Sequence, residues 1–157
     1  MRARRVGQEL VMHEIAVREV GVGSTQLVHR AMAALRPHHD DVAAFVARVD
    51  GQQRPQGYRL LGAFFNASTE AVGVLGLRHI SNLWAGDILY VDDLSTLPEA
   101  RRRGVARALL DAVVVEARSL GCAQVHLDSG HQRHAAHKVY LEHGFEISSH
   151  HFSLVLE

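Results

Sequence analysis

The sequence predicts a mixed α/β fold, in which strands and helices alternate along the chain. Ile15 to Val20 alternates apolar and polar side chains, the two-residue period of a half-buried strand. The segment after Gly104 instead carries one broad apolar stripe from Val105 to Leu120, the period of an amphipathic helix. Taken together, the patterns give the order β-α-α-β-β-β-α-β-α-β-β.

The N-terminal half contains the first strand, two helices and three further strands. Ser24 is expected to cap a helix from Thr25 to about Leu35 that Pro37 stops. Asp40 is expected to open a second helix, which Gly51 closes. The expected boundaries are 41–49 for this second helix, 52–57 for a loop, and 58–65, 71–78 and 88–96 for strands, with 66–70 as a hairpin connection.

The C-terminal half begins with the most clearly patterned helix, which Gly121 is placed to end. A strand over 123–128 and a short helix over 135–143 follow, and Gly144 ends that helix. Two apolar segments, 145–147 and 152–156, are expected to complete the sheet as strands.

The length and composition of the chain indicate its domain organisation, its partners and its expected location. The 157 residues suggest one domain over 13–157, preceded by a flexible arm over 1–12. Lys plus Arg and Asp plus Glu are balanced at 17 each, which gives no electrostatic argument for a nucleic-acid or membrane partner. Cys122 is alone, and neither a signal peptide nor a membrane-spanning run is evident, so we expect a cytoplasmic protein.

The segment from Asp92 to Ala106 is the most informative part of the chain. An apolar strand leads through a short turn into three arginines, Gly104 and the start of a helix. Free N–H groups and the helix dipole favour a phosphate group at such a helix start, and arginines add charge-assisted contacts. Gly104 allows the backbone to approach closely. The pattern lacks the Lys-Ser/Thr of a P-loop and the further glycines of a dinucleotide fingerprint, and it predicts a pyrophosphate site.

The chain resembles the GNAT superfamily of acyl-CoA-dependent N-acetyltransferases in three features. They are Arg-x-x-Gly-x-Ala over residues 101–106, Tyr140 before Gly144-Phe145, and the order of elements. The resemblance implies a mostly antiparallel sheet flanked by helices, acetyl-CoA as co-substrate and a primary amine as acceptor. Residues 133–144 are also similar to aminoalkylphosphonate acetyltransferases. Homodimers are common in the superfamily, so a homodimer is compatible with the resemblance. The residues implied in CoA binding are Leu94, Ser95 and Thr96 along the pantetheine arm, and Arg101, Arg102, Arg103, Gly104, Val105, Ala106 and Arg107 at the pyrophosphate.

Asp92 and Asp93 are the candidate bases, with Asp92 preferred because the superfamily's polyamine acetyltransferases carry a Glu at that place. Adjacent strand residues point to opposite faces unless a bulge re-aims them. The ordinary pKa of a carboxylic acid is about six units below that of an alkylammonium. Transfer of the proton from the ammonium to a carboxylate is therefore unfavourable by roughly 8 kcal/mol. The Asp must therefore have a raised pKa, act through water, or mainly bind the ammonium while neutral amine reacts. Tyr140 is the candidate acid for the departing thiolate.

Arg78 and His79 precede the strand of Asp92 and are candidates to line the acceptor pocket. Six of the twelve histidines cluster between His131 and His151, but no Cys cluster or His-Glu-x-x-His pattern supports a metal, so no metal is expected. A non-catalytic acyl-CoA-binding module would need the loop at Gly104 but not Asp92 or Tyr140.

Overall fold

The computed structural model describes residues 14–66 and 68–157, so the predicted arm over 1–12 lies outside the described residues. One sheet has the strand order β1-β2-β3-β4-β5, antiparallel from β1 to β4 and parallel between β4 and β5. The strands are β1 (Ile15–Val20), β2 (Arg59–Phe65), β3 (Gly73–Asn82), β4 (Gly86–Thr96) and β5 (Gln124–Leu127). The helices are α1 (His29–Leu35), α2 (Val42–Arg48), α3 (Val105–Ser119) and α4 (His134–His143).

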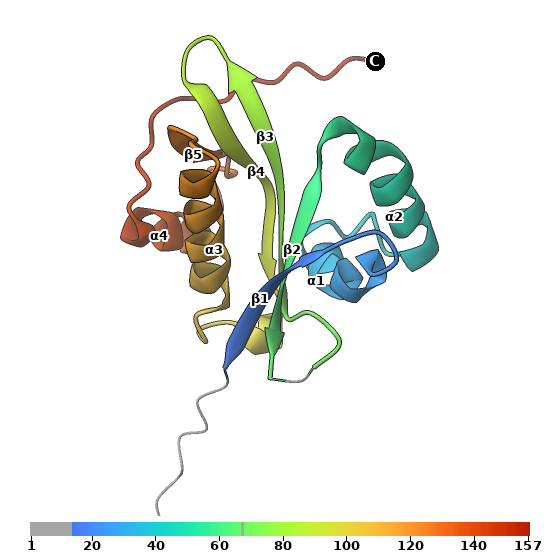
Figure 1. Cartoon of the computed structure of the whole chain (residues 1–157). Helices are drawn as coiled ribbons and strands as arrows, with labels where there is room; N and C mark the ends of the chain where they lie inside the picture. The colour runs from blue at the N-terminus through green and yellow to red at the C-terminus, as the bar shows by residue number, and fades with distance from the viewer. Residues whose placement is uncertain (1–13, 67) are drawn as a thin grey trace, which may run out of the picture.

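Helices cover both faces of this sheet. In Figure 1, α1 and α2 lie on one side of the central strands, and α3 and α4 lie on the other. The two covered faces explain why β2 and the first half of β3 are apolar in an almost unbroken run, rather than alternating. The core residues of β2, β3 and β4 with no exposed surface include Leu60, Phe64, Leu75, Leu77 and Leu89.

The α3 helix packs its predicted stripe against the sheet. Val105, Leu109 and Val113 are buried, whereas Val115 on the opposite face is exposed. Gly73 allows the close approach, because a Cβ at this position would lie 2.4 Å from a methyl carbon of Val105. The helix therefore holds its N-terminus beside the end of β4.

The two N-terminal helices differ from the prediction in their details. Residues 25–28 form a 3-10 turn before α1, and the side chain of Ser24 makes no capping hydrogen bond. Asp41, not Asp40, caps α2 by accepting a hydrogen bond of 2.7 Å from the N–H of Ala44. Gly51 does not end the helical segment, which continues as a π turn over Val49–Gln53 and a 3-10 turn over Arg54–Gln56 in place of the predicted loop.

The predicted strands over 145–147 and 152–156 are wrong. No strand follows α4 in the described chain, and Ile147, Phe152, Leu154 and Leu156 are exposed. An alternating pattern shows that a segment can form a strand, but a strand also needs an edge to pair with. The sheet of the described residues ends at β5, which has only four residues. No helix of the described residues has both the length and the apolar character that crossing a bilayer requires.

Candidate active site

A β-bulge in β4 brings the two candidate carboxylates to one place. The pairing of β3 with β4 shifts between Gly76, which faces Asp93, and Leu77, which faces Val91, so Asp92 is the additional residue. Such a bulge changes the direction of a side chain that regular alternation would send to the opposite face. Asp92 and Asp93 accordingly both line a cavity of about 320 Å³, together with residues of α1, α2 and the segments that follow them.

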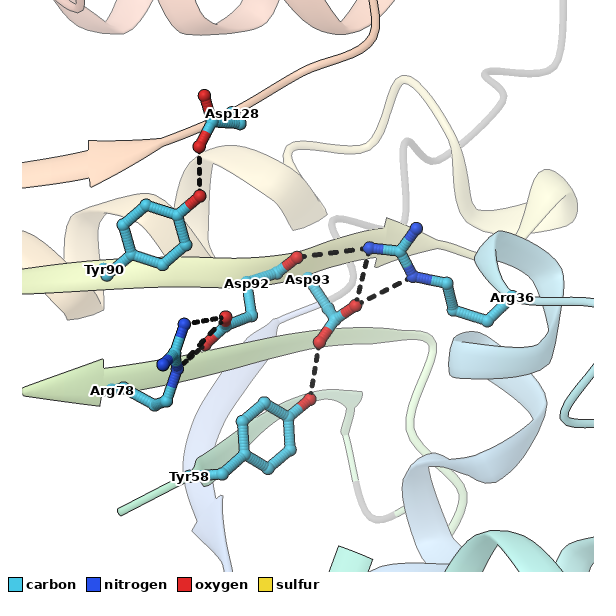
Figure 2. Close-up of polar contacts among 7 residues, drawn as sticks. All are labelled: Arg36, Tyr58, Arg78, Tyr90, Asp92, Asp93 and Asp128. Atoms are coloured by element: carbon cyan, nitrogen blue, oxygen red, sulfur yellow. Dashed lines mark hydrogen bonds and ion pairs between the residues drawn. The ribbon is translucent and has the colours of Figure 1, made fainter. Parts of the chain in front are cut away.

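Asp93 is the more deeply held carboxylate, with 12% of its side chain exposed. Its Oδ2 accepts a hydrogen bond of 2.7 Å from the hydroxyl of Tyr58, and its Oδ1 accepts one of 3.0 Å from Nε of Arg36 (Figure 2). Burial raises the pKa of Tyr58 far above its ordinary value, and the negative charge of Asp93 raises it further. The phenol therefore remains protonated and acts as a donor.

The sequence did not single out Tyr58 and Arg36. They reach Asp93 from 35 and 57 residues away along the chain. One local signal was present, because a glycine inside a strand often marks a close approach. A Cβ at Gly76 would lie 2.0 Å from the Tyr58 hydroxyl oxygen, so this glycine provides the space for the phenol.

Asp92 is held by Arg78 of β3, whose own register partner on β4 is Tyr90. Nε and Nη2 of Arg78 donate to the two carboxylate oxygens at 2.9 and 2.7 Å (Figure 2). This pairing raises the pKa of Arg78. Arg78 thus contacts a candidate base instead of lining the cavity, whereas His79 is exposed and does not line the cavity either.

The second half of β4 has one open edge. The pairing of β4 with β5 ends at Val91 and Leu127, while β3 still pairs with β4 as far as Thr96. In the described chain, Leu94, Ser95 and Thr96 therefore have a neighbouring strand on one side only. Main-chain groups that point to this edge are available to an extended ligand, as the resemblance to GNAT enzymes requires for pantetheine.

The start of α3 has the features of a diphosphate site. Gly104 has φ +81° and precedes the first helical residue, and Arg102 also has a positive φ, +59°. In the described part of the chain, no main-chain N–H of residues 102–107 donates a hydrogen bond to another main-chain group. Arg101, Arg102 and Arg103 are exposed around these N–H groups. Unpaired donors, a helix N-terminus and three guanidinium groups fit a diphosphate.

Tyr140 lies in α4 and is partly buried, with its ring 6.0 Å from that of Phe145. Burial raises the pKa of its phenol, against the opposing effect of the positive charge of Arg133. Within residues 14–66 and 68–157, its hydroxyl has no hydrogen-bond partner, and no contact joins it to Asp92 or Asp93.

Two histidines of the C-terminal cluster, His137 and His143, have protein partners. His137 interacts with the carbonyl of Gly130 at 2.9 Å, and His143 with Asp111 at 2.8 Å. No group of three or more His, Cys, Asp or Glu residues within the described chain has an arrangement that could hold a metal ion.

Comparison with known proteins identifies the family. Residues 25–145 match the Acetyltransferase (GNAT) family. The chain belongs to this family. It is 30% identical over 113 residues to the uncharacterized N-acetyltransferase YhdJ of Bacillus subtilis (strain 168), an alignment that covers 71% of this chain and 78% of the relative. The GNAT chain is therefore an N-acetyltransferase, and acetyl-CoA is its co-substrate.

Solved structures with lower sequence identity share the fold. Aminoglycoside N-acetyltransferase AAC(6')-Iy in complex with CoA superposes with a TM-score of 0.78 at 18% identity, over 92% of this chain and 95% of that one. Ribosomal-protein-alanine N-acetyltransferase from Brucella melitensis biovar Abortus 2308 gives 0.76 at 13% identity, over 91% and 100%. These similarities concern the architecture alone, which is the mostly antiparallel sheet with flanking helices that the sequence predicts.

Proposed function

We propose that this GNAT enzyme transfers the acetyl group of acetyl-CoA directly to the primary amine of a small molecule. The observation that carries the proposal is the position of the cavity. Asp92 and Asp93 line it on β4, and the open edge of the same strand begins immediately after them. An amine at the carboxylates is thus next to the edge along which the thioester would lie, and such orientation supplies much of the rate of a bimolecular transfer.

The cavity size supports a small acceptor. Its volume of about 320 Å³ is at the lower end of the range for small-molecule pockets. Aminoalkyl phosphonates are one class of small amine that the similarity of residues 133–144 favours. The complex of AAC(6')-Iy with a bisubstrate analogue of CoA and acetylneamine shows that another protein of this architecture accommodates a small amine.

We assign Asp92 as the group that takes the proton from the amine, with Asp93 as the second carboxylate of the site. Arg78 fixes the orientation of Asp92 by binding both of its oxygens. We assign a main-chain N–H near Leu94 to the stabilisation of negative charge on the thioester oxygen, and the open edge of β4 after Val91 supports this assignment. Tyr140 is the proposed donor of a proton to the CoA sulfur, because its hydroxyl is protonated and has no partner in the described chain.

For the co-substrate we assign the main chain of Leu94, Ser95 and Thr96 to the pantetheine arm. The N–H groups and side chains from Arg101 to Arg107 are assigned to the diphosphate. The free donors at the start of α3 support this assignment.

The direct test is incubation of the protein with acetyl-CoA and a panel of small primary amines, while the release of free thiol is followed. We expect thiol release that depends on the amine, and an N-acetylated product detectable by mass spectrometry. CoA binding by calorimetry is measured in parallel. Tight CoA binding with no turnover on any amine would instead support a non-catalytic acyl-CoA-binding module.

A further inference from the structure

Among the described residues, three guanidinium groups and two carboxylates lie in the lining of the acceptor cavity or pair with it. Two arginines, Arg36 and Arg48, line it opposite the two aspartates. Arg78 lies outside the lining but pairs with Asp92, so guanidinium groups outnumber carboxylates at this site. His38 and His39 are also in the lining. Burial lowers the pKa of His39, and the nearby positive groups His38 and Arg48 lower it further, against the effect of Asp93.

The two carboxylates are already paired. Arg78 occupies both oxygens of Asp92, and Arg36 and Tyr58 occupy those of Asp93. An alkylammonium that carried no other charge would have to compete with these donors for its binding site. It would also enter a cavity whose remaining charged groups repel it.

Arg48 is the arginine of the cavity lining that has no ion-pair partner in the described chain. It is the last residue of α2, exposed, and forms no ion pair or hydrogen bond among residues 14–66 and 68–157. Arg36 is half-buried and bonded to Asp93, with 40% of its side chain exposed, so a second anion can reach it from the cavity. A ligand anion that binds Arg48 and Arg36 would draw Arg36 away from Asp93, and this carboxylate would then be available to an ammonium group.

We propose that the acceptor is a small primary amine that also carries an anionic group, a carboxylate or a phosphonate. The anion binds Arg48 and Arg36, and the amine faces Asp92 and Asp93. This inference rests on the proposed function, since it names the substrate class of the same site. Arg48 is then a residue that determines specificity, and it takes no part in the chemistry.

The test compares amines of similar size and different charge. β-Alanine and aminoethylphosphonate carry an anion, propylamine carries none, and ethylenediamine carries a second cation. The quantity measured is the ratio of kcat/KM for each anionic amine to kcat/KM for propylamine. We expect this ratio to exceed one in the wild type and to fall about tenfold or more in Arg48→Gln, mainly through KM, because a charge-assisted hydrogen bond is lost. Arg48→Glu should shift the preference towards ethylenediamine.

Arg118→Gln is the matched control. Arg118 is also an exposed arginine in the last turn of a helix, α3, so its loss removes a similar helix-dipole interaction at a distance from the cavity. We expect the wild-type ratio in this variant. A wild-type ratio of one or less, or an equal fall in both variants, overturns the proposal while amine acetylation itself stands.

A second measurement separates this inference from the proposed function. Aminoethylphosphonate is titrated by calorimetry into wild type and Arg48→Gln without acetyl-CoA. If no amine is acetylated, the proposed function fails. Binding that is weaker by about tenfold in Arg48→Gln would still support the anion site, and equal or undetectable binding to both proteins would overturn it.

Discussion

The hydroxyl of Tyr58 donates a hydrogen bond of 2.7 Å to Asp93, and it joins the residue before β2 to the second half of β4 (Figure 2). Tyr58 as a whole residue is 4% exposed. Burial and the carboxylate together raise the pKa of Tyr58 well above its ordinary value of 10.0. This pair links the stability of the sheet to the geometry of the acceptor cavity.

The raised pKa of Tyr58 predicts how the free energy of unfolding changes at alkaline pH. Above about pH 10, the unfolded chain loses the phenolic proton that the folded protein keeps, so the unfolded state binds fewer protons and the free energy of unfolding falls as pH rises. We expect Tyr58→Phe to be less stable by about 1–3 kcal/mol at neutral pH, because a hydrogen bond to a charged group is lost. Its free energy of unfolding should then fall less than that of wild type above pH 10. Urea titrations of both proteins at neutral and alkaline pH measure this, and parallel curves would refute the role of Tyr58.

The close approach of Gly76 to Tyr58 predicts that a larger side chain at position 76 disturbs the Tyr58–Asp93 pair. A Cβ at Gly76 would lie 2.0 Å from the phenolic oxygen, so Gly76→Ala should displace Tyr58 from Asp93 and destabilise the protein by about 1–3 kcal/mol. Gly51→Ala is the control, since a Cβ there meets no atom within 4 Å. We expect the control to be neutral or slightly stabilising. Chemical denaturation compares the two variants, and equal stability would show that the strand shifts to accommodate the methyl group.

The tight Tyr58–Gly76 contact illustrates what the sequence could and could not predict. The strand over 88–96, which the structure extends back to Gly86, and the helix after Gly104 were predictable, because their apolar patterns and end residues are local. The bulge at Asp92 was foreseen only as a condition for both carboxylates to meet, since a bulge depends on the partner strand. Arg36 and Tyr58 reach Asp93 through tertiary packing, which no local pattern encodes.

In the C-terminal segment, a local pattern predicted strands that the structure does not contain. Phe152, Leu154 and Leu156 have the alternation of a strand, yet the structure leaves them exposed and unpaired with the sheet. Strand formation requires an adjacent edge in register, and alternation alone carries no information about which edge that is. The roles of Asp92, Tyr140 and the loop at Gly104 are predictions from the sequence, and substitution of each residue tests them.

Gly104 and Gly121 provide a matched pair for the CoA loop. Both have a positive φ, +81° and +72°, both lack any atom within 4 Å of a Cβ position, and they lie at opposite ends of α3. Alanine at either position should therefore lower the free energy of unfolding by a similar amount, roughly 1–2 kcal/mol. Only Gly104→Ala should also weaken CoA binding, by about tenfold or more, because it turns the N–H groups assigned to the diphosphate. Calorimetric titration with CoA measures the affinity, and equal affinities in the two variants would contradict the assignment.

Asp92→Asn tests the proposed base. The substitution keeps the size of the side chain and removes the charge, so kcat should fall by about 10²–10⁴ while CoA affinity stays the same. Asp93→Asn should chiefly lower the free energy of unfolding, because it weakens the contacts with Tyr58 and Arg36. Steady-state kinetics and denaturation are compared for both variants. If Asp93→Asn keeps its stability and loses the larger share of kcat, the base is Asp93.

Tyr140→Phe tests the proposed acid. Burial raises the pKa of this phenol, so its hydroxyl stays protonated at neutral pH and can donate to the sulfur that leaves the acetyl group. We expect kcat to fall by about 10²-fold or more with CoA affinity unchanged, since the ring and its packing on Phe145 are kept. Tyr90→Phe is the control, because it removes a phenol that donates to Asp128, the residue after β5, and has no proposed role in the reaction. A loss of kcat in Tyr90→Phe as large as that in Tyr140→Phe would assign the effect to structure, and full activity of Tyr140→Phe would exclude the phenol as the proton donor.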